Sequence, residues 1–145
     1  MSIQDFIIRL AFALVGGFII GFERGWHHKS AGLRTNTLVA VGSALFVMLS
    51  INLTQEKGDV TRIVAQVVSG IGFLGAGIIF KEGLTVHGLT TAATVWCSSA
   101  IGCLAAAGYY IETLIGTIFV LIINNLLLPL DKKLSERDKE DEEEK

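Results

Sequence analysis

Residues 6–22 of this chain read FIIRLAFALVGGFIIGF, an apolar run in which Arg9 is the single charged residue before Glu23. The run is about as long as the roughly 17–25 residues that a helix needs to cross the hydrocarbon core of a bilayer. Four further runs follow the same rule, at residues 37–53, 63–80, 89–107 and 113–130. A soluble domain of 145 residues could not bury five such helices. The sequence therefore predicts an all-α membrane protein with five short transmembrane helices.

The composition supports this fold class and sets the domain boundaries. Hydrophobic residues make up 51% of the chain, and 16 glycines accompany a single proline. Abundant glycine with little proline in apolar helices indicates close helix packing. We therefore expect one Gly-rich bundle over residues 1–130. Residues 131–145 read DKKLSERDKEDEEEK. This charged segment has almost nothing to bury, so we expect a disordered tail.

The basic residues near the helix ends predict the orientation in the membrane. One side of the membrane would carry nine of them: Arg24, Lys29, Arg34, Lys81, Lys132, Lys133, Arg137, Lys139 and Lys145. The other side would carry three: Arg9, Lys57 and Arg62. Because basic residues concentrate on the cytoplasmic side of membrane proteins, the N-terminus is expected outside and the C-terminus in the cytoplasm.

Glycines in the first predicted helix form a stripe. Gly17, Gly21 and Gly25 recur every four residues, a spacing that lets another helix backbone approach closely. Two interpretations stay open for this stripe. It packs against another helix of the same chain, or it forms an interface between subunits. Five short helices with small residues on several faces also lead us to expect a homo-oligomer, by default a two-fold dimer.

The third predicted helix carries four glycines in eight positions, namely Gly70, Gly72, Gly75 and Gly77. They fall on two sides of a helix, which predicts a continuous helix sandwiched at the centre of the bundle. The alternative is a broken helix, because discontinuous helices in transporters expose carbonyl groups at half-membrane depth and form ion sites there.

The fourth predicted helix has one small and partly polar stripe. Its members are Thr91, Thr94, Ser98, Gly102 and Ala105, whereas Leu89 and Trp96 point the other way. Hydroxyl groups in helices commonly return hydrogen bonds to their own backbone. The second interpretation is a polar path beside the third helix. Gly102 is expected to be a helix-packing position in either case.

Charged residues gather at one predicted membrane face. Glu23 and Arg24 end the first helix there and Arg34 enters the second, while Lys81, Glu82 and His87 lie between the third and fourth. An unpaired charge near the membrane core is costly, so Glu23 is expected to pair with the two arginines. The pairs would form a structural clamp, or the cluster would bind an anion, a lipid headgroup or a partner protein.

Several motifs occur in a recognisable order. They are GFER at residues 21–24, GLRT at 32–35, AQVVSGIGFLGAG at 65–77, GLTTAA at 88–93, Trp96 and AIG at 100–102. This pattern resembles the MgtC/SapB family of bacterial inner-membrane proteins and covers nearly the whole predicted bundle. The resemblance implies a five-helix membrane domain in the inner membrane with a role in magnesium limitation and stress survival. Many members carry a soluble cytoplasmic domain after the fifth helix, whereas this chain continues into the charged tail.

The candidate binding residues combine the charged cluster with the family-like motifs: Glu23, Arg24, Arg34, Gln66, Thr90 and Thr91. Gln66 is included because the longest family-like run begins there, although the predicted topology starts its helix from the opposite membrane face. No phosphate loop, HExxH motif or Ser-His-Asp set is present, so we expect neither an enzyme nor a resident cofactor, and no nucleic-acid partner.

Two classes of function follow. The first is a regulatory membrane protein that binds a partner or ligand. The second is a channel or transporter for Mg²⁺ or another small solute. Magnesium prefers carboxylate or carbonyl oxygens. Between residues 6 and 130 every acid lies near the end of a predicted helix, which favours the first class. Which metal, if any, the protein handles is left open by the sequence.

Overall fold

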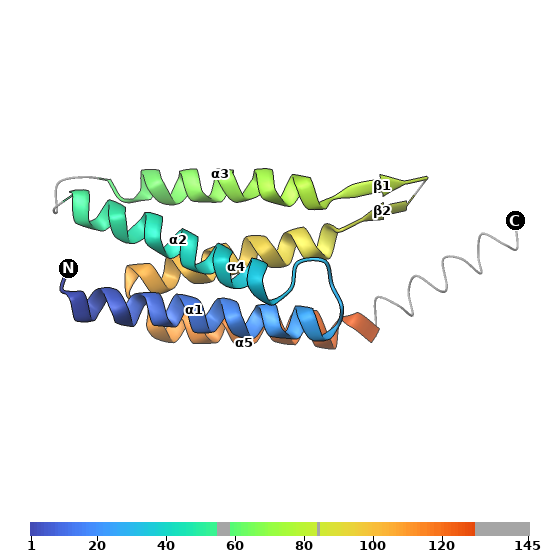
Figure 1. The fold of residues 1–145 in the computed structure, drawn as a ribbon, viewed down its shortest axis with the longest axis horizontal. Coiled ribbons are helices and arrows are strands. Elements are labelled where there is room, and N and C mark those ends of the chain that lie inside the picture. The colour runs from blue at the N-terminus through green and yellow to red at the C-terminus, as the bar shows by residue number, and fades with distance from the viewer. Residues whose placement is uncertain (55–58, 84, 130–145) are drawn as a thin grey trace, which may run out of the picture.

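Five helices run along the long axis of the molecule in the computed structural model, which describes residues 1–54, 59–83 and 85–129 (Figure 1). The helices are α1 (Ile3–Trp26), α2 (Leu33–Thr54), α3 (Thr61–Ile78), α4 (Leu89–Ala107) and α5 (Tyr110–Leu126). The prediction of five helices is confirmed. The first four are long and apolar enough to cross a membrane, whereas α5 is apolar but shorter, at 17 residues. The charged tail lies outside the described residues.

A short hairpin joins α3 to α4, and the sequence analysis did not predict it. Strand β1 (Phe80–Glu82) pairs antiparallel with β2 (Thr85–His87) and extends beyond the helices (Figure 1). The third apolar run was expected to continue as a helix to residue 80, but α3 ends at Ile78. We call this end of the bundle the hairpin end. The end of α1, the start of α2 and the start of α4 lie there, as the predicted gathering of charged residues required.

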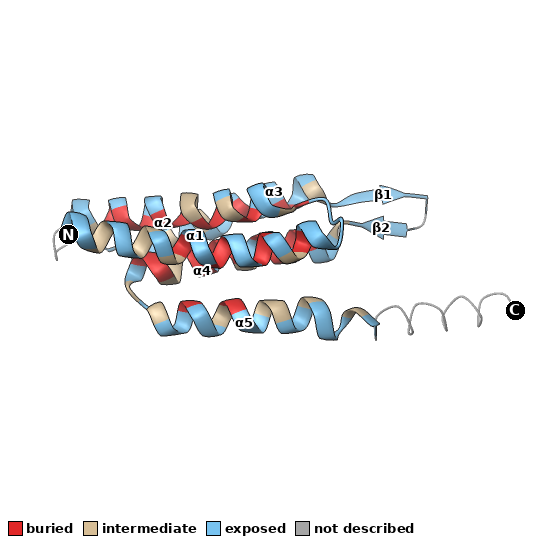
Figure 2. Ribbon diagram, turned by 60° about the horizontal axis from the view of Figure 1, so that its bottom comes forward, coloured by how far each residue is buried: buried red, intermediate tan, exposed pale blue. Residues whose placement is uncertain are grey.

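Helix α4 occupies the centre of the bundle. It contacts each of the other four helices, and ten of its residues are buried. Buried residues also concentrate along α2, whereas α5 is largely exposed (Figure 2). The small side chains of α4 explain its position, because Ser, Thr, Gly and Ala let neighbouring backbones approach from several sides.

Helix α3 lies at the periphery, so its predicted position at the bundle centre is wrong. It is continuous from Thr61 to Ile78 and buries only Ile71 and Gly75. A Cβ added at Gly75 would contact Ala92 of α4 at 3.6 Å. A Cβ at Gly70, Gly72 or Gly77 would meet no atom of the described residues within 4 Å. These three glycines therefore do not serve helix packing within the described part of the chain.

Asp59 precedes α3 and supports its first turn. Its carboxylate accepts hydrogen bonds from the hydroxyl and the backbone N–H of Thr61. These bonds stabilise the ionised form, so the pKa of Asp59 lies below its usual range.

The glycine stripe of α1 packs within the chain. A Cβ at Gly17 would lie 2.7 Å from the Cβ of Ala40 in α2, and one at Gly21 would lie 2.8 Å from the backbone of Leu33. The first interpretation of this stripe, packing inside one chain, is therefore the one that the structure shows. The residue Gly102 of α4 approaches α2 even more closely, since a Cβ there would overlap the backbone of Ala40.

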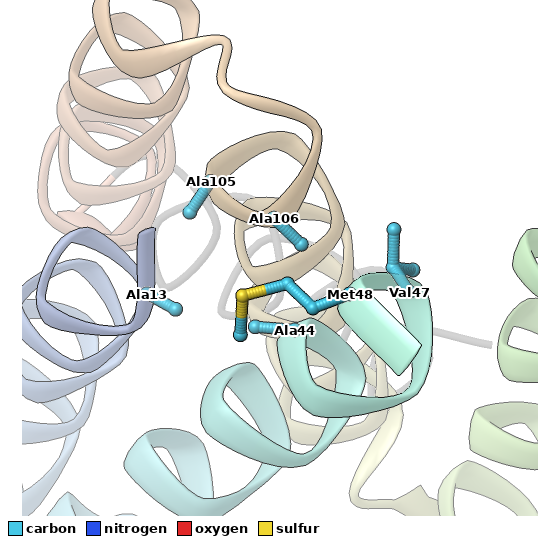
Figure 3. Packing of buried hydrophobic residues seen from close by; sticks show 6 residues of the cluster. All are labelled: Ala13, Ala44, Val47, Met48, Ala105 and Ala106. Atoms are coloured by element: carbon cyan, nitrogen blue, oxygen red, sulfur yellow. The ribbon is translucent and has the colours of Figure 1, made fainter. Parts of the chain in front are cut away.

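Two apolar clusters fill the space between the helices. The larger lies in the half of the bundle away from the hairpin and joins α1, α2 and α4, where Met48 extends toward Ala13 and Ala106 (Figure 3). The smaller, nearer the hairpin, contains Ala31, Val39, Ile71 and Val95. Alanines dominate the first cluster because the helix axes are close there.

The contrast between Gly102 and Gly70 gives the first prediction. Gly102→Ala is expected to destabilise the protein by about 1–3 kcal/mol or more, because the added methyl group has to displace the α2 backbone. The methyl group added by Gly70→Ala points into open space. The free energy of unfolding of this variant should therefore stay within about 1 kcal/mol of that of the original chain. Thermal unfolding of both variants in detergent measures the difference. Equal stability of the two variants would contradict the close contact between α2 and α4.

Candidate binding site at the hairpin end

Glu23 and Arg24 are neighbours on α1, but their side chains diverge. The Oε2 atom of Glu23 accepts a hydrogen bond from Asn124 Nδ2 at 3.1 Å, and its Oε1 atom lies 3.1 Å from Nδ1 of His27. Asn124 Oδ1 in turn accepts a long hydrogen bond from the hydroxyl of Thr94 at 3.4 Å. Glu23 therefore connects α1 to α5 and, through Asn124, to α4.

Arg24 turns toward the first turn of α4 and is only 2% exposed. Its Nη2 atom donates a hydrogen bond to Oγ1 of Thr91 at 2.7 Å. Its Nε atom is buried and has no hydrogen-bond partner among the described residues. Within the same residues, no carboxylate oxygen lies within 4.0 Å of the guanidinium. A buried cation with no carboxylate in ion-pair contact is energetically costly. Among the described residues, Arg24 Nε is the one buried side-chain N or O atom that has no hydrogen-bond partner.

The predicted clamp between Glu23 and the two arginines is not formed. Arg34 is exposed in the first turn of α2 and makes no ion pair with any described residue. The residue that turns inward from this turn is Asn36, which is fully buried. Residues that are two positions apart on an α-helix point about 200° apart, so Arg34 faces away from the bundle when Asn36 faces into it.

Asn36 was not among the predicted site residues, yet it links two helices. Its Nδ2 atom donates to the carbonyl groups of Ala31 at 2.8 Å and Gly32 at 3.0 Å. Its Oδ1 atom accepts a hydrogen bond from Ser98 Oγ of α4 at 2.8 Å. An amide directly before an apolar run was the available sequence signal, since a buried amide needs partners.

The polar stripe of α4 faces α1, α2 and α5 instead of forming a path beside α3. Further along the bundle, Ser99 Oγ lies 2.7 Å from Ser43 Oγ of α2. The hydroxyl of Thr94 also donates to its own helix, at the carbonyl of Thr90. Hydroxyl groups of α4 thus bond to carbonyl groups of their own helix, as predicted, and also to side chains of neighbouring helices.

The other predicted site residues divide into two groups. Thr90 is exposed beside Thr91, so it lies with Arg24 at the start of α4. Gln66 is exposed on α3, twelve residues before its end at Ile78. With a rise of about 1.5 Å per residue, that places it roughly 18 Å along the helix from the hairpin end. The structure therefore brings Glu23, Arg24, Thr90 and Thr91 together and leaves Arg34 and Gln66 apart from them.

The start of α4 is an electropositive surface. In any helix the first N–H groups have no partner within the helix, and they carry the positive end of its dipole. Gly88 occupies the position before α4 and has no side chain that could cap them. Its φ of 87° suits glycine, and a Cβ at this position would overlap the carbonyl of Ile78 at the end of α3. Close contact between two helix ends therefore requires glycine here.

No group of three or more His, Cys, Asp or Glu side chains that could hold a metal ion occurs within residues 1–54, 59–83 and 85–129.

Comparison with known proteins adds a family to this geometry. The family model described as "MgtC family" matches residues 10–133. An uncharacterized protein from Synechocystis is 53% identical over 130 residues, which cover 90% of this chain and 55% of that protein. Proteins named "Protein MgtC" are 57% identical over 121 residues in Brucella abortus and 46% identical over 136 residues in Salmonella typhimurium.

These matches cover 83% and 94% of this chain, but 50% and 58% of the two named relatives. The chain thus spans about half the length of the curated relatives it matches. None of the solved structures matches this chain.

Asn36 gives the second prediction. Asn36→Ala leaves the Ser98 hydroxyl and the Ala31 carbonyl without their partner, whereas the Gly32 carbonyl keeps the backbone N–H of residue 36. The substitution should lower the free energy of unfolding by about 1–3 kcal/mol. The matched control is Asn125→Ala, because Asn125 is exposed and bonds only to the Leu121 carbonyl of its own helix. Thermal unfolding in detergent compares the two variants. A larger loss at Asn125 than at Asn36 would contradict the assigned bonds.

Proposed function

Because the chain belongs to the MgtC family, we propose that it acts under magnesium limitation and stress by binding a membrane partner or ligand at the hairpin end. The proposal places a multi-pass protein in the bacterial inner membrane, with a binding role and not a catalytic one. The link to magnesium rests on the family resemblance of the motifs at residues 21–24, 65–77 and 88–93.

This function is supported by a difference in hydrogen bonding, because some buried polar groups have partners for all their buried donors and others do not. Inside the bundle the buried hydroxyl and amide groups bond to one another, as Ser43 does to Ser99 and Asn36 to Ser98. At the hairpin end the buried guanidinium of Arg24 keeps an unused donor. Polar groups that are costly to bury are commonly functional, so this end is where binding is expected.

Transport of Mg²⁺ or another small solute is the alternative. A cation path needs oxygen ligands along its length. A groove of about 580 Å³ lies between α2 and α3, and its walls are apolar apart from a few groups such as Ser43 and Gln66. Such walls suit hydrocarbon better than a hydrated cation. We therefore place binding ahead of transport.

Orientation and assembly form part of the same proposal. The count of basic residues supports a cytoplasmic hairpin end with the N-terminus outside. We also expect a homo-oligomer, by default a two-fold dimer. Gly17 and Gly21 pack against α2 within one chain, so a dimer would have to use another surface.

A growth test with matched carboxamides gives the third prediction. Glu23→Gln removes the charge that faces His27 and Asn124, whereas Glu112→Gln removes an exposed charge in the first turn of α5, at the opposite end. In a bacterium that depends on this protein for growth at low magnesium, we expect Glu23→Gln to reduce growth and Glu112→Gln to preserve it. Immunoblots of membranes check that both variants accumulate equally.

Two results would count against the proposal. If cells with Glu23→Gln grow as well as cells with the original protein, at equal protein level, the function does not depend on the hairpin end. Magnesium flux into proteoliposomes of the purified chain, above that of empty vesicles, would favour the transport alternative instead.

A further inference from the structure

We propose that Arg24 and the first turn of α4 form a binding site for a phosphate group. This inference rests on the proposed binding function of the hairpin end and names the chemistry of its ligand. The group could belong to a lipid headgroup or to free phosphate. Both present the same oxygen atoms to the protein.

The two arginines of α1 differ in what surrounds them. Arg9 lies near the end of α4, where it donates to the carbonyl of Ala106 and pairs with Asp5 at 3.0 Å. A cation is favourable there, because the C-terminal end of a helix is the negative end of its dipole. Arg9 thus has both a carboxylate and a favourable helix end.

Arg24 has neither of these. It lies against the start of α4, the positive end of the same dipole, and contacts Thr91 in the first turn. Its one neighbouring carboxylate, Glu23, bonds to Asn124 and faces His27 instead. A buried guanidinium beside a positive helix end, with no carboxylate within 4.0 Å among the described residues, has the electrostatics of an anion-binding site.

The available donors fit the oxygens of a phosphate group. The N–H groups of Leu89, Thr90 and Thr91 are the first three of α4, and Gly88 offers no side chain to occupy them. Such helix starts bind phosphate readily in proteins. The Nε atom of Arg24 adds a buried, unpartnered donor from the α1 side. Guanidinium groups recognise phosphate oxygens with paired hydrogen bonds.

The position of the turn provides access from the membrane surface. Leu89 is 57% exposed and Thr90 is also exposed, whereas Thr91 and Arg24 lie beneath them. If α1 and α4 cross the bilayer, their shared end lies at the level of the lipid headgroups. A phosphate group held by these outer amides would lie beside the turn that Arg24 contacts through Thr91.

The test uses the full chain purified in an uncharged maltoside detergent, with the side-chain Nε–H resonance of Arg24 as the readout. Arg24→Lys identifies the resonance by its disappearance. Sodium phosphate is titrated in one series, and phosphatidylglycerol in mixed micelles in a second. Sodium chloride at matched ionic strength is the baseline. We expect one or both probes to shift the Arg24 resonance with saturation, while the Arg9 resonance stays in place.

The outcomes distinguish the sources and can overturn the inference. A shift with phosphate identifies free phosphate as a ligand, and a shift with phosphatidylglycerol alone identifies the headgroup. No saturable shift of the Arg24 resonance with either probe would refute the site. This measurement uses the original chain, so it stands even if a variant does not fold.

Matched substitutions at the two arginines give a second readout. Ligands that bind the folded state raise its thermal stability. Arg24→Lys keeps the charge but loses the planar donor fork, so its apparent affinity for the active probe should fall about tenfold or more. Arg9→Lys should leave that affinity unchanged. Equal affinity of Arg24→Lys and the original chain would also contradict the site.

Growth at low magnesium separates this inference from the function proposed above. If Glu23→Gln reduces growth but neither probe shifts the Arg24 resonance, the phosphate site is refuted and the proposed binding function stands. If the Arg24 resonance responds to phosphate but the Glu23→Gln variant grows normally, the phosphate site is supported and the proposed binding function is refuted.

Discussion

Close contact between the backbones of α4 and α2 is the constraint on which the rest of the bundle depends. Gly102 removes the side chain that would hold these helices apart, and the backbone of Ala40 takes that space. Once α4 is that close to α2, its Ser and Thr hydroxyls reach partners on neighbouring helices. The bonds of Ser98 with Asn36 and of Ser99 with Ser43 follow from this proximity. A thin central helix thus organises the bundle through backbone contact and short polar bonds.

The dipole of α4 makes its two ends electrostatically different, and α1 places an arginine at each. Arg9 bonds to the carbonyl end of α4 and pairs with the carboxylate of Asp5, so its role is structural. Arg24 meets the amide end and one hydroxyl. The difference between two identical side chains on one helix is the physical basis for assigning binding to the hairpin end. Glu23, although adjacent to Arg24 in sequence, accepts a hydrogen bond from Asn124 of α5 and faces His27.

Much of the fold could be predicted from the sequence, because apolar run length is a direct requirement of the bilayer. The same reasoning was wrong about which helix is central. The four glycines of α3 suggested close packing on two sides, but three of them face open space in the described structure. The hydroxyl stripe of α4 was the better indicator, since it supports both close approach and hydrogen bonding. The pairing of β1 with β2 was missed because the first residue of β1, Phe80, continues an apolar run.

The candidate site could be predicted only in part. The cost of burying charge predicts a role for Glu23 and Arg24, and the motif at residues 88–93 predicts one for Thr91. The structure joins Arg24 to Thr91 and Glu23 to Asn124 at the hairpin end. The partners could not be predicted, because they depend on helix rotation: Asn36 faces inward and Arg34 outward from the same turn. Asn124, in the last turn of α5, is a partner of Glu23 through the packing of α5 against α1.

If a phosphate group completes the environment of Arg24 at the start of α4, its phosphorus atom lies close to the side-chain nitrogens of Arg24. Solid-state NMR of the ¹⁵N-labelled chain in phosphatidylglycerol bilayers can measure the dipolar coupling between side-chain nitrogen and phosphorus atoms. The account predicts dephasing of the Arg24 signal by ³¹P, from bilayer lipid or after free phosphate is added, and none for Arg9. An Arg24 signal without ³¹P dephasing under both conditions would contradict it.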